Sequence, residues 1–176
     1  YTSGTTGRSK GAMLTHHNLG SNCLVLKEFW QWQKDDVLLH ALPIFHVHGL
    51  FVAAHGALIN GSKMIWLPRL DTAQLIQCLP RATVMMGVPT FYVRLTSDKA
   101  FTKTVCRNMR LFISGSAPLL TETFNDFKKI TGHTILERYG MSETIMLTSN
   151  PYQGPRVGGA VGISLPGVSV RVVGDD

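Results

Sequence analysis

The residues best suited to chemistry lie at the start of the chain, in a segment rich in glycine and hydroxyl side chains. Glycines let the backbone turn sharply and point its N–H groups inward, while hydroxyls add hydrogen-bond donors and Lys10 adds a positive charge. This composition favours a loop that binds a polyphosphate. The candidate phosphate-binding residues are Thr2, Ser3, Gly4, Thr5, Thr6, Gly7 and Lys10.

This segment is not a Walker A loop. That motif needs Ser or Thr directly after its lysine, whereas Lys10 lies three residues after Gly7 and is followed by Gly11. Clusters of glycine, serine and threonine also form ordinary polar surface loops. The residues alone therefore leave open both a phosphate site and a polar loop without a ligand.

Two histidines and two arginines are further candidates for a site. His46 and His48 are two residues apart, but no third ligand follows at a suitable spacing, so the pattern disfavours zinc. Taken alone, Arg94 is typical of a surface arginine, and Arg138 could pair with a neighbouring glutamate. These four residues define no function by themselves.

Strand-length apolar runs alternate with segments of helical period, and this alternation predicts the elements that must position the candidate residues. It indicates an α/β fold with a mostly parallel sheet flanked by helices. The predicted strands are 37–42, 64–67, 83–86, 111–113 and 134–136, and the predicted helices are 16–32, 48–59, 72–79, 89–95 and 121–130. The alternating run 168–172 predicts the start of a β-rich subdomain at the C-terminal end.

Several residues predict where these helices begin and end. Thr15, Asp71 and Thr121 are candidate N-caps because their side chains can accept a hydrogen bond from a free backbone N–H group. Gly61 and Gly132 are candidate C-terminal stops, since glycine readily adopts the left-handed conformation that ends a helix.

The composition indicates a globular protein and limits the classes of partner that it could bind. The 176 residues are 44% hydrophobic and 16% charged, which is typical of a chain that forms a core. The net charge of +6 favours small anions, and the basic residues form no stripe with interleaved aromatics, which disfavours nucleic acid. No apolar run approaches the ~20 residues of a membrane span. Three widely separated cysteines indicate a reducing compartment rather than a disulfide framework.

Four motifs in order along the chain resemble the acyl-adenylate-forming superfamily, the AMP-binding acyl-CoA synthetases. Residues 1–11 resemble its phosphate-binding loop, although Ser9 stands where the family usually has proline. Residues 42–49 are similar to its second core motif, and 111–119 to the strand and turn that contact adenine. Residues 137–144 resemble the Tyr/Phe-Gly-x-Thr-Glu motif. The match implies ATP, Mg²⁺ and CoA as cofactors and co-substrates.

The resemblance assigns the nucleotide base to two of these motifs. Gly115, Ser116 and Ala117 would contact adenine. Tyr139 would stack on the same ring, with Gly140 beside it in the nucleotide-binding set.

The family resemblance also assigns roles to the residues nearest the reacting atoms. Ser142 stands where the family usually has threonine, and it keeps the hydroxyl that would contact a phosphate. Glu143 would bind Mg²⁺, and His46 would lie beside the carboxylate that is activated.

The substrate is implied by a closer resemblance to the malonyl-CoA synthetases of this superfamily. Arg94, Arg138 and Ser116 would hold one carboxylate of a short diacid while the other is activated near His46. The implied reaction joins malonate, or methylmalonate, to CoA with release of AMP and pyrophosphate. The alternatives are another short carboxylic acid, or a truncated nucleotide-binding fragment without activity.

The resemblance further implies that residues 1–176 are part of the AMP-binding N-terminal domain, without the C-terminal domain that bears a catalytic lysine. The chain alone is then expected to be inactive. The expected partners are small molecules only, and the expected location is the cytoplasm, or the mitochondrial matrix in a eukaryote.

Overall fold

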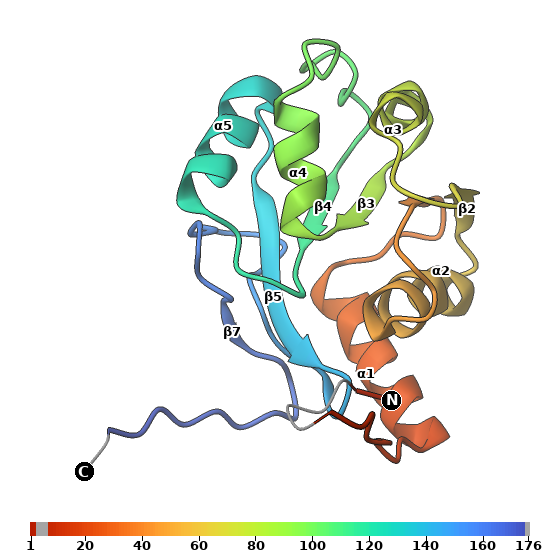
Figure 1. The fold of residues 1–176 in the computed structure, drawn as a ribbon, viewed down its shortest axis with the longest axis vertical. Helices are drawn as coiled ribbons and strands as arrows, with labels where there is room; N and C mark the ends of the chain where they lie inside the picture. Colours follow the sequence, from red (N-terminus) through yellow and green to blue (C-terminus); the bar gives the residue numbers. More distant parts are fainter. Residues whose placement is uncertain (3–6, 175–176) are drawn as a thin grey trace.

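A computed structural model describes residues 1–2 and 7–174, and within them seven strands form one sheet (Figure 1). The strands lie in the order β2-β1-β3-β4-β5-β6-β7. Neighbours from β2 to β5 are parallel, whereas β6 is antiparallel to both β5 and β7. Their bounds are Val37–His40 (β1), Lys63–Trp66 (β2), Val84–Gly87 (β3), Leu111–Ser114 (β4), Ile135–Met141 (β5), Ile145–Ser149 (β6) and Ile163–Ser164 (β7). The predicted mostly parallel sheet is confirmed.

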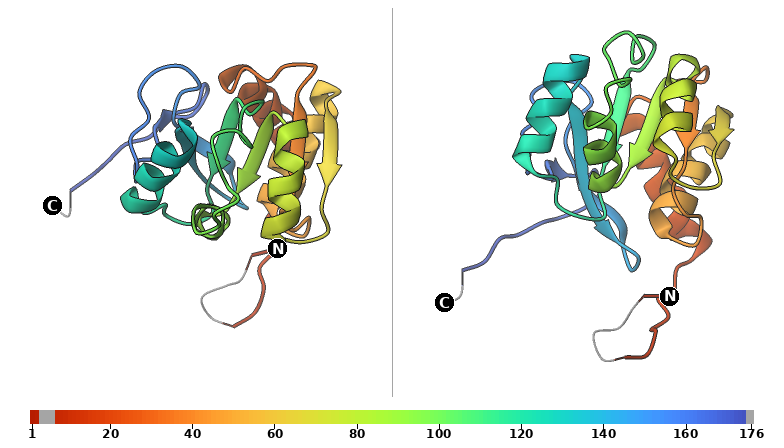
Figure 2. Two further views of the ribbon diagram at one scale, coloured as in Figure 1. Left: turned by 90° about the horizontal axis from the view of Figure 1, so that it is seen from above. Right: turned by 45° about the horizontal axis from the view of Figure 1, so that its top comes forward.

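Helices cover both faces of this sheet. The α-helices are His16–Phe29 (α1), His55–Asn60 (α2), Thr72–Cys78 (α3), Pro89–Thr96 (α4) and Thr121–Thr131 (α5). Helices α3, α4 and α5 pack side by side on one face, and α1 packs with α2 on the other (Figure 2). A π-helix, His48–Ala54, runs directly into α2, and a 3-10 turn, Leu79–Arg81, follows α3. None of the helices within the described residues has the length and apolar character needed to cross a membrane.

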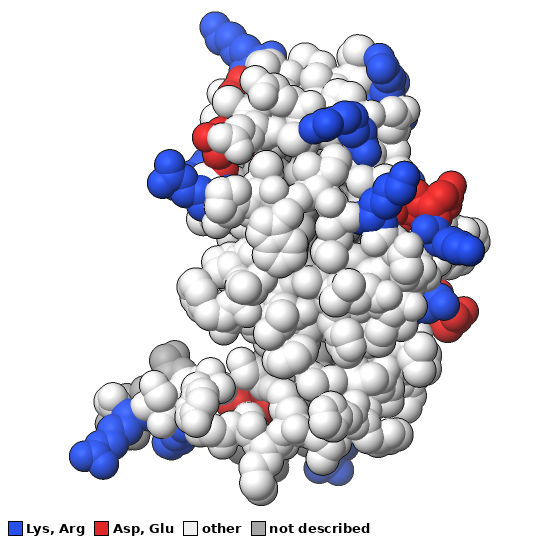
Figure 3. All heavy atoms as spheres, turned by 90° about the vertical axis from the view of Figure 1, so that its right-hand side faces the viewer, with Lys and Arg blue, Asp and Glu red and all other residues white. Residues whose placement is uncertain are grey.

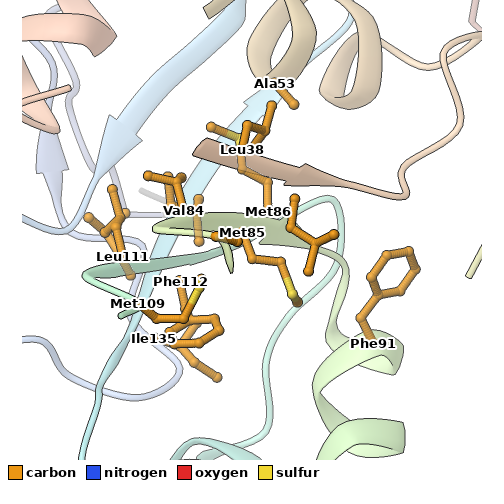
Figure 4. Close-up of a cluster of buried hydrophobic side chains, with 14 of the residues drawn as sticks. Leu38, Ala53, Val84, Met85, Met86, Phe91, Met109, Leu111, Phe112 and Ile135 are labelled. Carbon is orange, nitrogen blue, oxygen red and sulfur yellow. The ribbon is translucent and has the colours of Figure 1, made fainter. Parts of the chain in front are cut away.

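The core lies between the central strands and their covering helices. Strands β3 and β4 are buried along their whole length, as expected for parallel strands covered on both faces. Figure 4 shows Met85 and Phe112 from these strands packed with Ile135 of β5 and with Met109. This packing fixes the ends of the strands, which is where the candidate site is built.

Most of the predicted helix ends are confirmed. Thr15 and Asn18 form a reciprocal capping box at the start of α1, because each side chain accepts from the other's backbone N–H group. Asp71 caps α3 with a single bond, because its Oδ1 accepts from the backbone N–H group of Gln74 at 3.0 Å. Gly61 and Gly132 both adopt the left-handed conformation at the ends of α2 and α5.

Three predicted elements differ from the structure. Thr121 is the first residue of α5 rather than its N-cap, and that position belongs to Leu120, which has no capping side chain. The first helix ends at Phe29 rather than at residue 32, because the buried Trp30 turns inward and donates its indole N–H to Ser149. The predicted strand 168–172 does not form, since within the described residues no strand lies beside it to pair its backbone groups.

The charged side chains are spread over the surface. On the face shown in Figure 3, Lys and Arg lie apart from one another along the upper part and the edges, with a broad uncharged area between them. The net positive charge therefore does not form a continuous basic stripe on this face.

Candidate active site

The motifs singled out in the sequence converge at the carboxyl ends of the parallel strands. The register places Gly87 of β3 beside Ser114 of β4, and Ser114 beside Glu137 of β5. The loop containing His46 follows β1 and leads into the π-helix. In open parallel sheets this edge is where ligands bind, because the connecting loops leave a crevice there.

One pocket joins residues from three of the predicted motifs. It has a volume of about 360 Å³, and its walls include Thr2 of the glycine-rich loop, His46 after β1 and Ser142 after β5. Apolar side chains form much of the rest, including Phe45 and Phe51. The fold therefore brings together a phosphate-loop residue, the candidate carboxylate-side histidine and the candidate phosphate-contacting hydroxyl.

The two ends of the glycine-rich segment are paired with each other. The backbones of Thr2 and Lys10 exchange two hydrogen bonds, of 2.8 and 3.0 Å, which hold the two ends of the loop together. Gly7 has a φ of 96°, a conformation that side-chain-bearing residues rarely adopt. Lys10 is exposed, so its ammonium group is free to meet an anion. The predicted residues Ser3, Gly4, Thr5 and Thr6 lie outside the described residues.

The last predicted motif forms the tip of the β5–β6 hairpin. Tyr139 and Gly140 lie in β5, and Ser142 and Glu143 lie in the turn. Tyr139 exposes about half of its surface, which leaves a ring face available for stacking. Gly140 is required because a Cβ atom there would overlap the carbonyl group of Ile145.

Glu143 has the surroundings that a Mg²⁺ site needs. Its exposed carboxylate lines a second groove, with a volume of about 420 Å³, together with polar side chains of α1. Within the described residues, no three His, Cys, Asp or Glu side chains gather as a metal cluster. Mg²⁺ often takes one protein carboxylate together with phosphate oxygens and water, so Glu143 fits such a site.

Strand β5 carries a buried arginine, whose guanidinium lies against Gly115. Arg138 is only 3% exposed, and its Nε and Nη2 atoms have no hydrogen-bond partner among the described residues. Burial lowers the pKa of Arg138 to about 10, so the guanidinium is still charged at neutral pH. An unpaired buried charge is strongly unfavourable, so a partner anion would stabilise this guanidinium.

Ser116 and His48 complete the surroundings of this arginine. Gly115 lies directly under the guanidinium, and the next residue, Ser116, adopts a φ of 70° that is strained for a non-glycine residue. Its Oγ lies 3.2 Å from Nδ1 of His48, within hydrogen-bond distance. The turn after β4 thus places Gly115 against the guanidinium and the hydroxyl of Ser116 against His48.

His48 was given no role by the sequence beyond a disfavoured metal site. It is 2% exposed, and its Nε2 has no partner among the described residues. Burial first, and then the charge of Arg138, hold the pKa of His48 well below its usual value, so the ring is neutral at neutral pH. His46 also acts on this pKa, which shows that His46, His48 and Arg138 share one neighbourhood.

Arg94 lies apart from this cluster, and its predicted pairing with Arg138 on one carboxylate remains a prediction. Tyr92 points toward the sheet and donates its hydroxyl to the carbonyl of Ile113. Two positions further along a helix is a rotation of about 200°, so Arg94 lies on the opposite face of α4. It is exposed there and lines a shallow groove with Thr72 and Lys99.

Ala117 lies exposed in the turn that follows β4, one residue beyond Ser116. The predicted contact of Gly115, Ser116 and Ala117 with adenine remains a prediction. The turn is at the same sheet edge as Tyr139, which is the other residue predicted to contact the base.

The chain belongs to the AMP-binding enzyme family, which it matches over residues 1–176. Among curated relatives, it is similar to the mitochondrial malonate–CoA ligase ACSF3 of Mus musculus, with 43% identity over 192 residues covering 100% of this chain and 33% of that protein. The malonate–CoA ligase of Arabidopsis thaliana is 38% identical over 196 residues, covering 100% and 32% respectively.

A solved structure gives the same relationship in three dimensions. ATP-bound MatB from Rhodopseudomonas palustris superposes with a TM-score of 0.93 and 60% sequence identity, covering 96% of this chain and 34% of that one. The fold is thus that of the N-terminal domain of adenylate-forming enzymes. The chain spans about a third of the length of these relatives.

Proposed function

We propose that the full-length protein containing this chain is a malonate–CoA ligase that acts through an acyl adenylate. The observation that carries the proposal is Arg138, a buried cation with two unpartnered nitrogens among the described residues, which acts together with His46 on the pKa of the buried His48. A monocarboxylic acid activated near His46 would leave that charge unpaired. A short diacid supplies one carboxylate for activation and a second for the arginine.

The proposed reaction has two steps. A carboxylate oxygen of malonate attacks the α-phosphorus of ATP, the bond to the β-phosphate breaks, and pyrophosphate leaves. The CoA sulfur then attacks the acyl carbon, its proton is lost, and AMP leaves with the oxygen that came from malonate. Methylmalonate is the second substrate of the proposal, because one methyl group changes discrimination by only ~1–3 kcal/mol.

The residues of this chain bind and orient the reactants. The loop closed by Thr2 and Lys10 binds phosphate oxygens through N–H groups and an ammonium group. Ser142 donates to a phosphate, and Tyr139 stacks on adenine. Glu143 holds Mg²⁺, which neutralises phosphate charge when it is bound.

Recognition of the second carboxylate falls to three residues. Arg138 supplies the charge and can bind a carboxylate through two parallel N–H groups. Ser116 supplies a hydroxyl, and His48 orients that hydroxyl from 3.2 Å away. His46 lies on the pocket side of this cluster, where the reacting carboxylate would sit.

Gly115 gives a test of this geometry that changes no polar group. A Cβ atom at Gly115 would overlap the guanidinium of Arg138, so Gly115→Ala should displace the guanidinium. We expect kcat/KM for malonate to fall by about tenfold or more, since small displacements of positioning groups have large kinetic effects. Gly20→Ala is the matched control, because nothing lies within 4 Å of its added methyl group. Equal kinetics for both variants would contradict the placement of Arg138 in the substrate site.

The function itself is tested with a panel of acids. Purified full-length protein is supplied with ATP, Mg²⁺, CoA and malonate, methylmalonate, acetate or benzoate, and thioester formation is measured. We expect turnover with the diacids and little with the monocarboxylic acids. Turnover of acetate equal to that of malonate would favour the alternative of another short acid.

The 176-residue chain is tested in the same panel. We propose that it forms no thioester by itself, since it spans about a third of the relatives' length. Malonyl-CoA formed by this chain alone would contradict that. The mouse relative is named as mitochondrial, and a location in the cytoplasm or the matrix stays a prediction for this protein.

A further inference from the structure

The side chain of Asn22 on α1 makes a paired contact with strand β6. Its Nδ2 donates to the carbonyl of Met146 at 2.8 Å, and its Oδ1 accepts from the N–H group of Met146 at 3.3 Å. Asn22 therefore pairs with both backbone groups of one residue, as a neighbouring strand would. Because 124 positions separate the two residues, the contact fixes α1 against the β5–β6 hairpin.

The contact lies next to a strained point in the backbone. Ile145, the residue before Met146, has a φ of 60°, a conformation that β-branched residues rarely adopt. Across the hairpin, Gly140 approaches Ile145 so closely that no Cβ atom would fit there. A strained conformation persists only where surrounding contacts hold it, and Asn22 holds the adjacent residue.

The strained point sits directly behind the turn that carries Ser142 and Glu143. Glu143 and Asn22 line the same polar groove, so the helix and the turn face each other. Helix α1 also begins at the Thr15 capping box, which follows closely after the loop closed by Lys10. One helix thus connects the phosphate loop to the hairpin tip.

We propose that Asn22 is a positioning residue that holds the Ser142–Glu143 turn against the triphosphate of ATP. This proposal rests on the proposed function, because it takes adenylate formation as the step that needs the turn. In the first half-reaction the turn faces all three phosphates. In the second, pyrophosphate has left and only the adenylate ester remains. Loss of the contact therefore slows the first half-reaction more than the second.

The test compares Asn22→Ala with Ser21→Ala in the full-length protein. Ser21 lines the same groove, but its hydroxyl donates only to the carbonyl of Asn18 in its own helix. The first half-reaction is measured as malonate-dependent exchange of pyrophosphate into ATP. The second is measured as malonyl-CoA formation from supplied malonyl adenylate. In Asn22→Ala we expect exchange to fall by about tenfold or more and thioester formation to stay within about twofold.

A second measurement does not depend on activity. Hydrogen exchange at the Met146 amide should become faster in Asn22→Ala, because that N–H group loses its acceptor. Ser21→Ala should leave it unchanged.

Three outcomes decide the matter. A selective loss of pyrophosphate exchange, together with faster exchange at Met146, supports the proposal. Unchanged pyrophosphate exchange, or an equal loss in both half-reactions, overturns it, since equal loss indicates a general effect on folding. If the wild type shows no exchange with malonate, the proposed function fails separately. The same ratio is then measured with the acid that the wild type does activate.

Discussion

Replacing Arg138 by Gln should lower kcat/KM for malonate by about 100-fold, which is about 2.7 kcal/mol of lost substrate binding. Of Arg138, Ser116 and His48, Arg138 alone carries a positive charge at neutral pH, because the pKa of His48 is held well below its usual value. A glutamine keeps much of the volume but offers no charge to the second carboxylate. Steady-state kinetics of the full-length variant measure the effect.

The stability of Arg138→Gln should not fall with its activity. This distinguishes loss of the substrate site from a general disruption of the fold. Arg138 is buried with Nε and Nη2 unpartnered within the described part of the chain. Removing an unpaired buried charge usually stabilises a protein. The melting temperature of Arg138→Gln should therefore equal or exceed that of the wild type. A lower melting temperature with a parallel loss of all activities would argue against a substrate role.

Arg94→Gln tests the other arginine of the pair predicted from the sequence. Arg94 is exposed on the far face of α4, in a groove away from Ser116 and His48. We expect its malonate kinetics to stay within about threefold of the wild type, since surface substitutions have small effects. A loss as large as that of Arg138→Gln would support the two-arginine clamp predicted from the sequence.

Asp36→Asn should destabilise the fold by about 3 kcal/mol, because it breaks a largely buried ion pair at the other end of the sheet. The Asp36 carboxylate is 2% exposed and pairs with Arg110, whose Nε donates to Oδ1 at 2.7 Å. Thr83 and the backbone N–H group of Gln33 donate to the same carboxylate, each at 2.7 Å. The substitution leaves Arg110 without its counter-charge, over the ring of Tyr152.

Urea unfolding of the full-length protein at neutral pH measures this loss. The exposed neighbour Asp35 provides the control Asp35→Asn, for which we expect a change of less than about 0.5 kcal/mol. Equal stabilities of the two variants would show that the Asp36 pair does not hold the strands together.

The ion pair between Asp36 and Arg110 also predicts how the stability of the fold depends on pH. Burial alone would raise the pKa of Asp36, but hydrogen bonds from Arg110, Thr83 and Gln33 outweigh it and lower the pKa below 3.8. A lowered pKa stabilises the fold above the unfolded value, and the contribution is lost as the pH falls through the folded value. The stability difference between wild type and Asp36→Asn should therefore be full at neutral pH and shrink as the pH falls below 3.8.

Local patterns predicted the sheet and three of its site motifs. The apolar runs ending near residues 40, 86 and 113 were recognisable as buried parallel strands. The carboxyl ends of such strands share one edge, and His46 and Ser116, which the family resemblance assigned to one substrate, both follow strands of this sheet. Gly7 and Gly61 were recognisable because left-handed backbone demands glycine.

Long-range packing decided what the sequence did not reveal. His48 begins the π-helix and Arg94 lies in α4, and both look like ordinary helix residues in the sequence. Only the packing of these two helices buries His48 beside Ser116 and leaves Arg94 exposed. The β5–β6 hairpin extends through a Tyr-Gly motif with no strand pattern, and Asn22 contacts its second strand from more than a hundred positions away. Residues 168–172 alternate like a strand, yet alternation without a neighbouring strand forms none.

The most direct test of the central claim follows one oxygen atom. Malonate labelled with ¹⁸O in its carboxylates is supplied to the full-length protein with ATP, Mg²⁺ and CoA. The ¹⁸O content of the products is then measured by mass spectrometry. Activation through an acyl adenylate transfers one labelled oxygen to AMP, because the carboxylate oxygen bonded to the α-phosphorus leaves with it. We expect one label in each AMP and none in pyrophosphate. Unlabelled AMP, or label in phosphate released with ADP, would contradict the account.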